Sequence, residues 1–345
     1  MHTFAPQLRA EVIERPERVA SIAAEWRRLY RQSPARTPFQ SPEWLLPWIE
    51  IFCPVNLRVI AVWDQGGLVG LAPLLIYPRD SERVLAFAGG GISDYLDLIA
   101  ESGKESAVRQ AVVSAVLEDR SWTTLELTDV APHSILLGSP ELRGLSSTHD
   151  TSSLLVLPSN PGELLAKFSN RQRANLRNAR SRLERAGGGA IEGASANTLP
   201  EFLDDLFRLH TMCWSERGEP GVLHDERLRA FHRMAAPQLL ERGMLRIYRL
   251  RVEANSAAVI YALCDGGTVY CYLQGFNPRF AFVSPGTLLM YSVIEAAVRS
   301  GMRSFDFLRG QEAYKQHWRP ESRPTYRIAL GRSAVAGLSS LPEAA

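Results

Sequence analysis

The sequence predicts an α/β fold built as two halves that share one order of elements. At 345 residues the chain is long enough for two domains of about 150 residues, and its 46% hydrophobic content can fill two cores. Stretches with the two-residue period of strands alternate with stretches that have the spacing of amphipathic helices. Each half also contains a glycine-rich hairpin turn, at residues 64–67 and 265–267.

The first half is expected to begin with two helices and a hairpin, followed by alternating strands and helices. In the first helix Val19, Ile22 and Trp26 fall on one side. Ser41 followed by Pro42 is typical of a helix start, because serine caps the first amides and proline lacks an N–H that this position does not use. The expected strands are 8–14, 57–63, 68–77, 84–88, 95–100, 123–127 and 154–157, and the expected helices are 15–30, 41–52 and 106–118.

The two halves are expected to meet near Pro158 and Pro161, which interrupt the pattern. We therefore predict an N-terminal half at 1–158, a C-terminal half at 159–335 and a flexible tail at 336–345. The expected helices of the second half are 162–185, 199–214, 226–242, 285–300 and 312–318, and its expected strands are 245–252, 257–264, 268–276 and 304–308.

Charge and composition exclude several classes of protein. The 39 Lys and Arg residues nearly balance 37 Asp and Glu residues, so we expect no nucleic-acid partner and no general attraction to membranes. Residues 1–19 lack the apolar core of a signal peptide, and no apolar run is long enough to span a bilayer. We expect a cytoplasmic protein without membrane insertion. The four cysteines have no paired spacing, which predicts neither a disulfide framework nor a metal site.

Residues 283–289 combine serine, proline and glycine at the start of an apolar helix. Ser284 is expected to cap this helix and Pro285 to begin it, which leaves the next backbone amides unpaired. Such a helix end binds phosphate, and Gly286 lets a diphosphate approach the backbone closely. The alternative is an ordinary Ser-Pro helix start without a ligand.

Polar and ionisable side chains are dense in residues 305–318, at the end of a predicted strand. Their proximity could shift their pKa values and supply an acid, a base and an anion-binding group. The candidates are Asp306, Arg309, Glu312, Tyr314, Lys315 and His317. The alternative is an ion-paired surface turn in which Trp318 belongs to the core.

A cationic edge is predicted on the helix at 162–185. Arg173, Arg177 and Arg180 lie within one narrow arc of that helix and could hold a phosphorylated or nucleotide-linked substrate. A solvated charged face is the alternative.

The glycine-rich loop at 89–91 precedes Asp94 and Tyr95, which could line a pocket for the acceptor. A plain glycine-rich connection is equally consistent with these residues. For the histidines at positions 210, 224 and 232, core or surface roles are favoured over catalysis, because no serine or cysteine motif accompanies them.

Together these segments resemble the GNAT-like acetyltransferases of the CelD type from cellulose biosynthesis, which are related to the FemAB peptidoglycan transferases. The matching segments are 38–44, 93–97, 173–180, 284–286, 306–310 and 314–315. The resemblance extends from about Trp26 to Arg327. It implies an α/β (α+β) fold of tandem GNAT-like domains, each with a mixed, mostly antiparallel sheet flanked by helices.

The resemblance further implies an acyltransferase that moves an acyl group from acetyl-CoA or another acyl-CoA to an amine, in polysaccharide or cell-envelope biosynthesis. The C-terminal half would hold the donor, and a cleft between the halves would admit the acceptor. The residues expected to bind the donor are Ser284, Gly286, Thr287 and Arg309. The residues expected to bind the acceptor are Asp94, Tyr95, Arg173 and Arg177. The glycine pattern of the usual GNAT Q/RxxGxG/A loop is missing from this sequence.

The expected mechanism is direct attack of the acceptor amine on the thioester. Asp306 or Glu312 would assist removal of the proton, and Tyr314 would protonate the leaving thiolate. Lys315 and Arg309 would stabilise the developing negative charge.

Two rival functions fit the same fold. One is transfer from an aminoacyl-tRNA, as in FemAB enzymes, and the other is a non-catalytic role in exopolysaccharide assembly. The sequence predicts no oligomeric state.

Overall fold

The computed structural model describes residues 8–52, 55–216 and 218–333, which divide into two compact units. Unit 1 contains the described residues up to Thr151 and those from Pro324 onward, and unit 2 is Ser152–Arg323. The chain passes between the units within strand β8 (Ser146–Val156) and again within strand β14 (Glu321–Gly331). The predicted tail at 336–345 lies outside the described residues.

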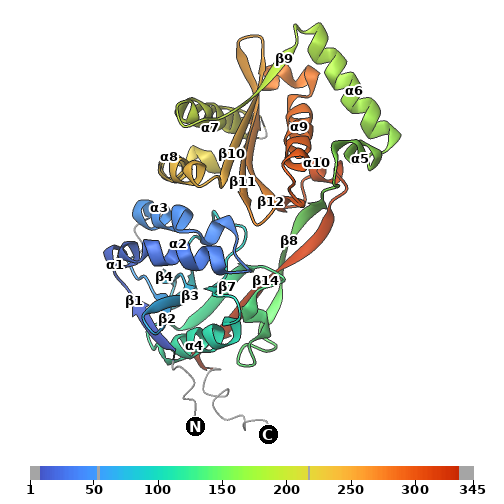
Figure 1. Cartoon of the computed structure of the whole chain (residues 1–345). Coiled ribbons are helices and arrows are strands. Elements are labelled where there is room, and N and C mark those ends of the chain that lie inside the picture. Colours follow the sequence, from blue (N-terminus) through green and yellow to red (C-terminus); the bar gives the residue numbers. More distant parts are fainter. Residues whose placement is uncertain (1–7, 53–54, 217, 334–345) are drawn as a thin grey trace. The chain divides into compact units, whose positions relative to one another are not determined.

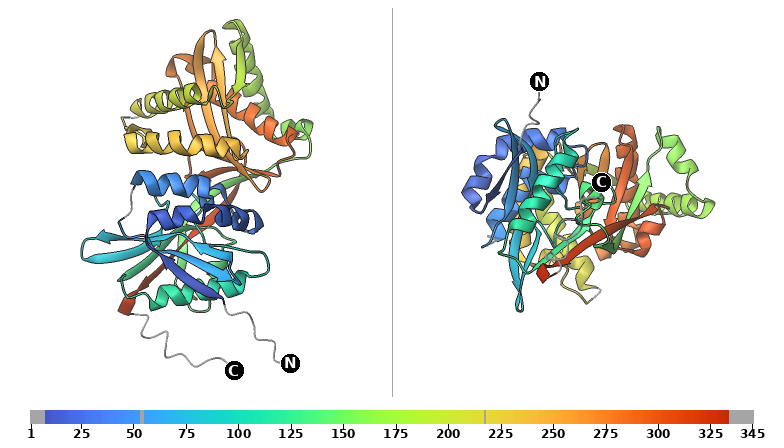
Figure 2. Two further views of the ribbon diagram at one scale, coloured as in Figure 1. Left: turned by 60° about the vertical axis from the view of Figure 1, so that its left-hand side comes forward. Right: turned by 90° about the horizontal axis from the view of Figure 1, so that it is seen from below.

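Unit 1 places helices on both sides of a small antiparallel sheet. Its elements are β1 (Arg9–Ile13), α1 (Pro16–Ser21), α2 (Ala23–Gln32), η1 (Pro38–Gln40), α3 (Pro42–Phe52), β2 (Val59–Asp64), β3 (Gly67–Ala72), β4 (Leu74–Arg79), β5 (Glu82–Phe87), β6 (Ile99–Ala100), α4 (Glu105–Glu118), β7 (Thr124–Val130) and η2 (Ile135–Gly138). The sheet has the order β1-β2-β3-β6, with α2 and α4 on opposite sides (Figures 1 and 2). A second set of strands has the order β4-β5-β7-β14, in which only the β5–β7 pair is parallel.

Two elements predicted as continuous in unit 1 are divided. The strand expected at 68–77 is β3 and β4, which belong to different sheets and are separated by Pro73. Proline cannot donate a ladder hydrogen bond, so the strand ends there. The helix expected at 15–30 is α1 and α2, because Ile22 has φ −97 and ψ 13, outside the helical region.

Unit 2 is a mixed sheet with helices on both faces. Its elements, besides part of β8 and β14, are α5 (Pro161–Ala166), α6 (Asn170–Arg185), β9 (Gly189–Gly193), α7 (Leu199–Ser215), η3 (Val222–His224), α8 (Glu226–Glu241), β10 (Leu245–Val252), β11 (Asn255–Asp265), β12 (Thr268–Phe276), η4 (Pro278–Val283), α9 (Pro285–Arg299), β13 (Ser304–Arg309) and α10 (Ala313–Gln316). The strand order is β8-β13-β12-β11-β10-β9, and only the β12–β13 pair is parallel.

The helices of unit 2 are arranged so that α9 and α6 lie together. Helices α7 and α8 cover one face of β10–β12, and α9 covers the other, with α6 and α5 packed against α9 (Figures 1 and 2). Helix α7 approaches β12 closely at Gly275, where an added Cβ would lie 2.5 Å from the backbone nitrogen of His210. Only glycine fits at that position.

The single helix expected at 162–185 is two helices, α5 and α6. Ser169 begins α6 with a capping box: its hydroxyl accepts from the amide of Gln172 at 3.2 Å, and the Gln172 side chain accepts from the amide of Ser169 at 2.7 Å. The reciprocal bonds stabilise a new helix start and turn the chain between α5 and α6.

Because unit 2 contains two buried histidines, we expect its free energy of unfolding to fall in acid. His210 and His232 are 3% and 1% exposed, and burial lowers their pKa to about 4 and about 3. An unfolded histidine titrates near pH 6.5, so below that pH the unfolded state binds more protons and stability falls as the pH drops. We expect a loss of about 2 kcal/mol per histidine at about pH 5, measured by urea denaturation against neutral pH. Replacing His232 with leucine should make this loss of stability smaller. Replacing His224, which is exposed, should leave the loss unchanged. Equal losses in the two variants would contradict the prediction.

Candidate functional site

A cavity of about 190 Å³ lies inside unit 2, where α6, the start of α9 and the end of α10 meet. Its apolar part is lined by Phe168, Leu176, Ala179, Tyr291 and Trp318. Its polar part is lined by Gln172, Asn175, Asn178, Arg182, Ser284, Thr287 and His317. A concave site with an apolar base and convergent polar groups is typical of small-molecule binding.

The start of α9 differs from the expected serine cap. Ser284 has left-handed φ 54 and ψ 54, and its hydroxyl accepts no bond from the helix amides. Helix η4 runs directly into this residue, with the Ser284 amide donating to the Ala281 carbonyl at 2.9 Å, so the chain needs a left-handed residue to turn into α9. The Ser284 hydroxyl instead accepts from a guanidinium nitrogen of Arg182, at 3.2 Å.

The first amides of α9 are available at the cavity. Within the described part of the chain, the backbone amides of Gly286 and Thr287 have no hydrogen-bond acceptor. Thr287 lines the cavity, and no atom would obstruct a Cβ added at Gly286 within 4 Å. The positive end of the helix dipole therefore lies at a space that can hold an anion, where the unpaired residue Thr287 lines the cavity and Gly286 precedes it in the chain.

Arg182 of α6 is the charged residue that the structure places at this helix end. It lines the cavity, is half-buried, and its Nε atom is buried with no partner in the described residues. Sequence reasoning missed it, because Arg173, Arg177 and Arg180 looked like the cationic edge. Neither Arg173 nor Arg177 lines the cavity: Arg173 bonds Asn170 within α6, and Arg177 is exposed.

The polar turn after Phe305 is strained and internally bonded. Asp306 is 4% exposed, and its carboxylate accepts from the amide of Leu308 at 2.7 Å. Leu308 has φ 62 and Gly310 has φ 96, so two residues of the turn are left-handed. By accepting the amide proton of Leu308, the Asp306 carboxylate stabilises the strained backbone at this left-handed residue.

Lys315 holds the same turn from the other side. Its side chain is 2% exposed, and its ammonium donates to the carbonyls of Leu308 at 3.3 Å, Arg309 at 2.5 Å and Gly310 at 3.1 Å. It also pairs with Glu312 at 2.8 Å. An ammonium has three protons. These four acceptors therefore use all of its donors.

The other predicted residues of this segment lie around the turn rather than in the cavity wall. Arg309 ends β13, Glu312 is half-exposed at its bond to Lys315, and Tyr314 packs at the edge of the unit 2 core. Trp318 is a core residue, with its ring 5.6 Å from that of Phe168, and also lines the cavity. The end of the segment, rather than its charged middle, therefore reaches the cavity.

The predicted acceptor residues of the first half lie in the interior of unit 1. Asp94 and Tyr95 are 6% and 7% exposed. The carbonyl of Tyr95 accepts from the hydroxyl of Thr37 at 3.4 Å, and its ring lies 6.5 Å from that of Phe39. Nearby, burial raises the pKa of Asp97 to about 7, which keeps this carboxyl partly protonated at neutral pH. The segment 93–97 thus packs against η1.

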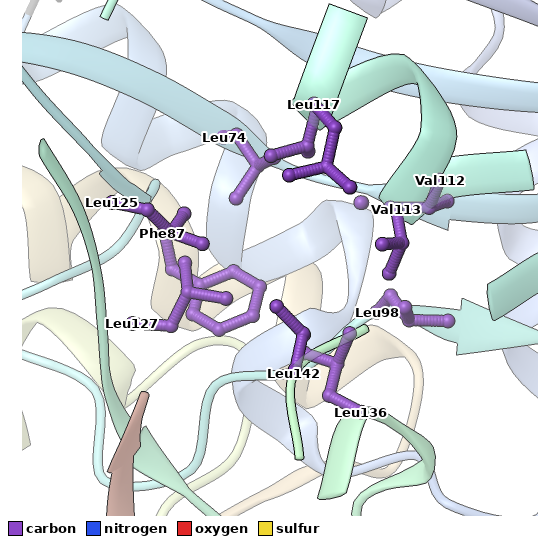
Figure 3. A pocket seen from close by; sticks show the side chains of 12 residues that line it. Leu74, Phe87, Leu98, Val112, Val113, Leu117, Leu125, Leu127, Leu136 and Leu142 are labelled. Carbon is purple, nitrogen blue, oxygen red and sulfur yellow. The ribbon is translucent and has the colours of Figure 1, made fainter. Parts of the chain in front are cut away.

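A second void, in unit 1, does not have the character of a binding site. It measures about 20 Å³ and every side chain around it is apolar, among them Leu74, Phe87 and Leu127 (Figure 3). A void of this size holds about one water molecule, and a water needs polar partners. It is a packing defect of the core.

No group of three His, Cys, Asp or Glu side chains in the described residues could hold a metal ion, and no helix among them is long and apolar enough to cross a membrane. Burial raises the pKa of Cys264 to about 11 and of Cys271 to about 12, so both thiols stay protonated. Cys53 lies outside the described residues.

One family of known proteins matches a segment that includes most of the residues around the cavity. Residues 170–316 match the acetyltransferase (GNAT) domain family. This GNAT segment runs from the start of α6 to the end of α10, and it includes the unpaired amides of α9, Arg182 and the polar turn. No match was found among curated proteins.

Solved structures resemble the whole chain and confirm its fold. The crystal structure of FemX gives a TM-score of 0.65 at 12% identity, over 91% of this chain and 97% of that one. A protein of unknown function from Bacteroides thetaiotaomicron VPI-5482 gives 0.58 at 12% identity, over 94% and 99%. The C-terminal domain of a presumed lysylphosphatidylglycerol synthetase from Agrobacterium fabrum gives 0.56 at 14% identity, over 93% and 95%. The predicted fold class, tandem GNAT-like domains with mixed, mostly antiparallel sheets flanked by helices, is confirmed.

Proposed function

We propose that this protein is an N-acyltransferase that uses acetyl-CoA or another acyl-CoA, and that the cavity of unit 2 holds the donor. The observation that carries the proposal is that Arg182 and the start of α9, where the amides of Gly286 and Thr287 are unpaired, meet at one cavity. A diphosphate is the anion that two amides, a helix dipole and a guanidinium bind well. The match of residues 170–316 to the GNAT family supports this reading.

The chemistry we propose is direct attack of an amine on the thioester. Tyr314 protonates the leaving thiolate, and Asp306 or Glu312 assists proton removal. The four bonds of Lys315 favour a positioning role, in which it fixes the turn that carries these groups. Phenylalanine at Tyr314 should lower kcat about 100-fold with KM for the donor little changed. A kcat equal to that of the native enzyme would remove Tyr314 from the mechanism.

The acceptor is an amine, which we propose belongs to polysaccharide or cell-envelope biosynthesis. This part of the proposal rests on the resemblance to CelD-type enzymes. The same resemblance supports two further assignments: the donor to residues 159–335, and contacts with the acceptor to residues 1–158. Since acyl-CoA is a cytoplasmic metabolite, we place the reaction in the cytoplasm.

Calorimetric titration with acetyl-CoA and longer acyl-CoAs tests the donor. We expect binding, and we expect glutamine at Arg182 to weaken it about 10-fold or more, because a charge-assisted hydrogen bond to phosphate is lost. Glutamine at Arg185, an exposed arginine at the end of the same helix, is the matched control and should leave the affinity unchanged. Absence of binding for every acyl-CoA would refute the proposal.

An aminoacyl-tRNA donor is the second candidate, and one feature of α6 favours it. The helix carries six arginines, and none of them forms an ion pair with a carboxylate in the described residues. Unneutralised arginines on one helix attract polyanions such as RNA. Loss of transfer activity after ribonuclease treatment of the reaction mixture would support this donor, and unchanged activity would exclude it.

A further inference from the structure

The donor cavity contains a titratable side chain to which the proposed mechanism assigns no task. His317 follows α10, is exposed, and lines the cavity together with Arg182 and Thr287. Its Nδ1 atom lies 3.3 Å from the carbonyl oxygen of Ala313. A carbonyl can only accept, so the proton of this bond is on Nδ1, and Nε2 is the atom that gains or loses a proton.

The surroundings of His317 would favour an anion next to it. No carboxylate is among the described residues that line the cavity, and the other charged or titratable groups that line it are Arg182 from α6 and Tyr291 from α9. On the segment of His317 itself, Glu312 and Lys315 are bonded to each other at 2.8 Å. A second positive charge beside Arg182 therefore becomes favourable when an anion enters the cavity.

We propose that His317 takes up a proton on Nε2 when the donor binds, and that the imidazolium and Arg182 bind the donor's diphosphate together. This inference rests on the proposed function and adds to it a residue that makes donor affinity depend on pH. The proton comes from solvent and returns to it on release of the donor. Because binding is linked to protonation, affinity rises as the pH falls through the range in which imidazole titrates.

The experiment is calorimetric titration of the whole protein with dephospho-coenzyme A from about pH 8 to about pH 5.5. This probe contains the diphosphate as a diester, whose charge is constant over the range, so the ligand itself adds no pH dependence. We expect the native protein to bind dephospho-coenzyme A about 10-fold more tightly at the acid end of the range. This increase in affinity is what one charge-assisted hydrogen bond contributes. His317→Asn keeps an N–H for the Ala313 carbonyl and removes Nε2, so its affinity should be nearly constant with pH.

A matched control and the outcomes separate this inference from the proposed function. His224→Asn, an exposed histidine elsewhere in unit 2, should retain the native pH dependence. A native affinity that does not change with pH, or an equal pH dependence in His317→Asn, would overturn the inference alone. Absence of binding to the native protein at every pH would overturn both. The melting temperature of each variant, measured at both ends of the range, shows that the compared proteins are folded.

Discussion

Replacing Lys315 with methionine should lower the free energy of unfolding by about 3 kcal/mol. The methionine side chain keeps the apolar stem and removes only the ammonium. The carbonyls of residues 308–310 then lose the donor that they share, and the Leu308 carbonyl loses it in the buried interior. The turn at Leu308 loses one of its two supports, the other being Asp306.

The effect of Lys315→Met is measured by urea denaturation followed by tryptophan fluorescence. Lys167→Met is the matched control, because Lys167 is an exposed lysine of unit 2 with a single carbonyl partner, Val156 at 3.0 Å. A loss below about 0.5 kcal/mol for Lys315→Met, as for ordinary surface changes, would show that the ammonium is not a structural support. If stability falls as expected, reduced turnover of this variant is evidence for positioning and not for contact with substrate.

Leucine at Arg249 should destabilise unit 2 by about 3–5 kcal/mol. This arginine of β10 is 4% exposed in its side chain and pairs with three carboxylates: Glu192 of β9 at 2.6 Å, and Glu201 and Asp205 of α7 at 2.6 and 2.8 Å. Its guanidinium also lies 4.2 Å from the centre of the Phe202 ring. Removing this buried cation leaves three carboxylates close together, of which Asp205 and Glu192 keep only the more exposed partners Arg208 and Arg251. Asp205 is too buried to be fully solvated.

Arg251→Leu is the comparison for Arg249→Leu. Arg251 lies on the same strand and shares the partner Glu192, but at 3.8 Å and with 36% of its side chain exposed. Exposed pairs of this kind contribute less than about 1 kcal/mol. Urea midpoints that fall by the same amount in both variants would mean that the cluster around Arg249 is no stronger than a surface pair.

Helices and strands with strong hydrophobic spacing could be predicted from the sequence, but their interruptions could not. Helices α4, α7, α8 and α9 and strands β10 to β12 lie close to their predicted ranges, because their core faces give a clear period. The breaks at Pro73 and Ser169 depend on single residues. The signal for the second was present, since serine followed three positions later by glutamine is the capping-box pattern.

Strand β14 was missed for a different reason. Its buried residues Thr325, Ile328 and Leu330 do not alternate regularly, because the ladder with β7 has an irregularity between Tyr326 and Ile328. Its partner strand lies about 200 residues earlier in the chain, so no local pattern identifies the pair.

The candidate site was predicted in part. The segment at Ser284 does border a cavity, and its free amides follow from the helix start that the sequence shows. The α6 side of the cavity was not foreseen. Charge alone drew attention to Arg173 and Arg177. The arginine that lines the cavity is instead determined by which side of α6 packs against α9. Arg182 lies three positions after Ala179, a buried residue of α6, so the two side chains are neighbours on the helix surface.

The two crossings of the chain within β8 and β14 make unit 2 an insertion in unit 1. Its ends meet, since the hydroxyl of Ser152 donates to the carbonyl of Arg323 at 3.3 Å. Every residue of unit 2 is synthesised before residues 326–331, which pair with β7. The contacts inside unit 2 need none of these residues, whereas unit 1 keeps the edge of β7 uncovered until they have been synthesised and have paired.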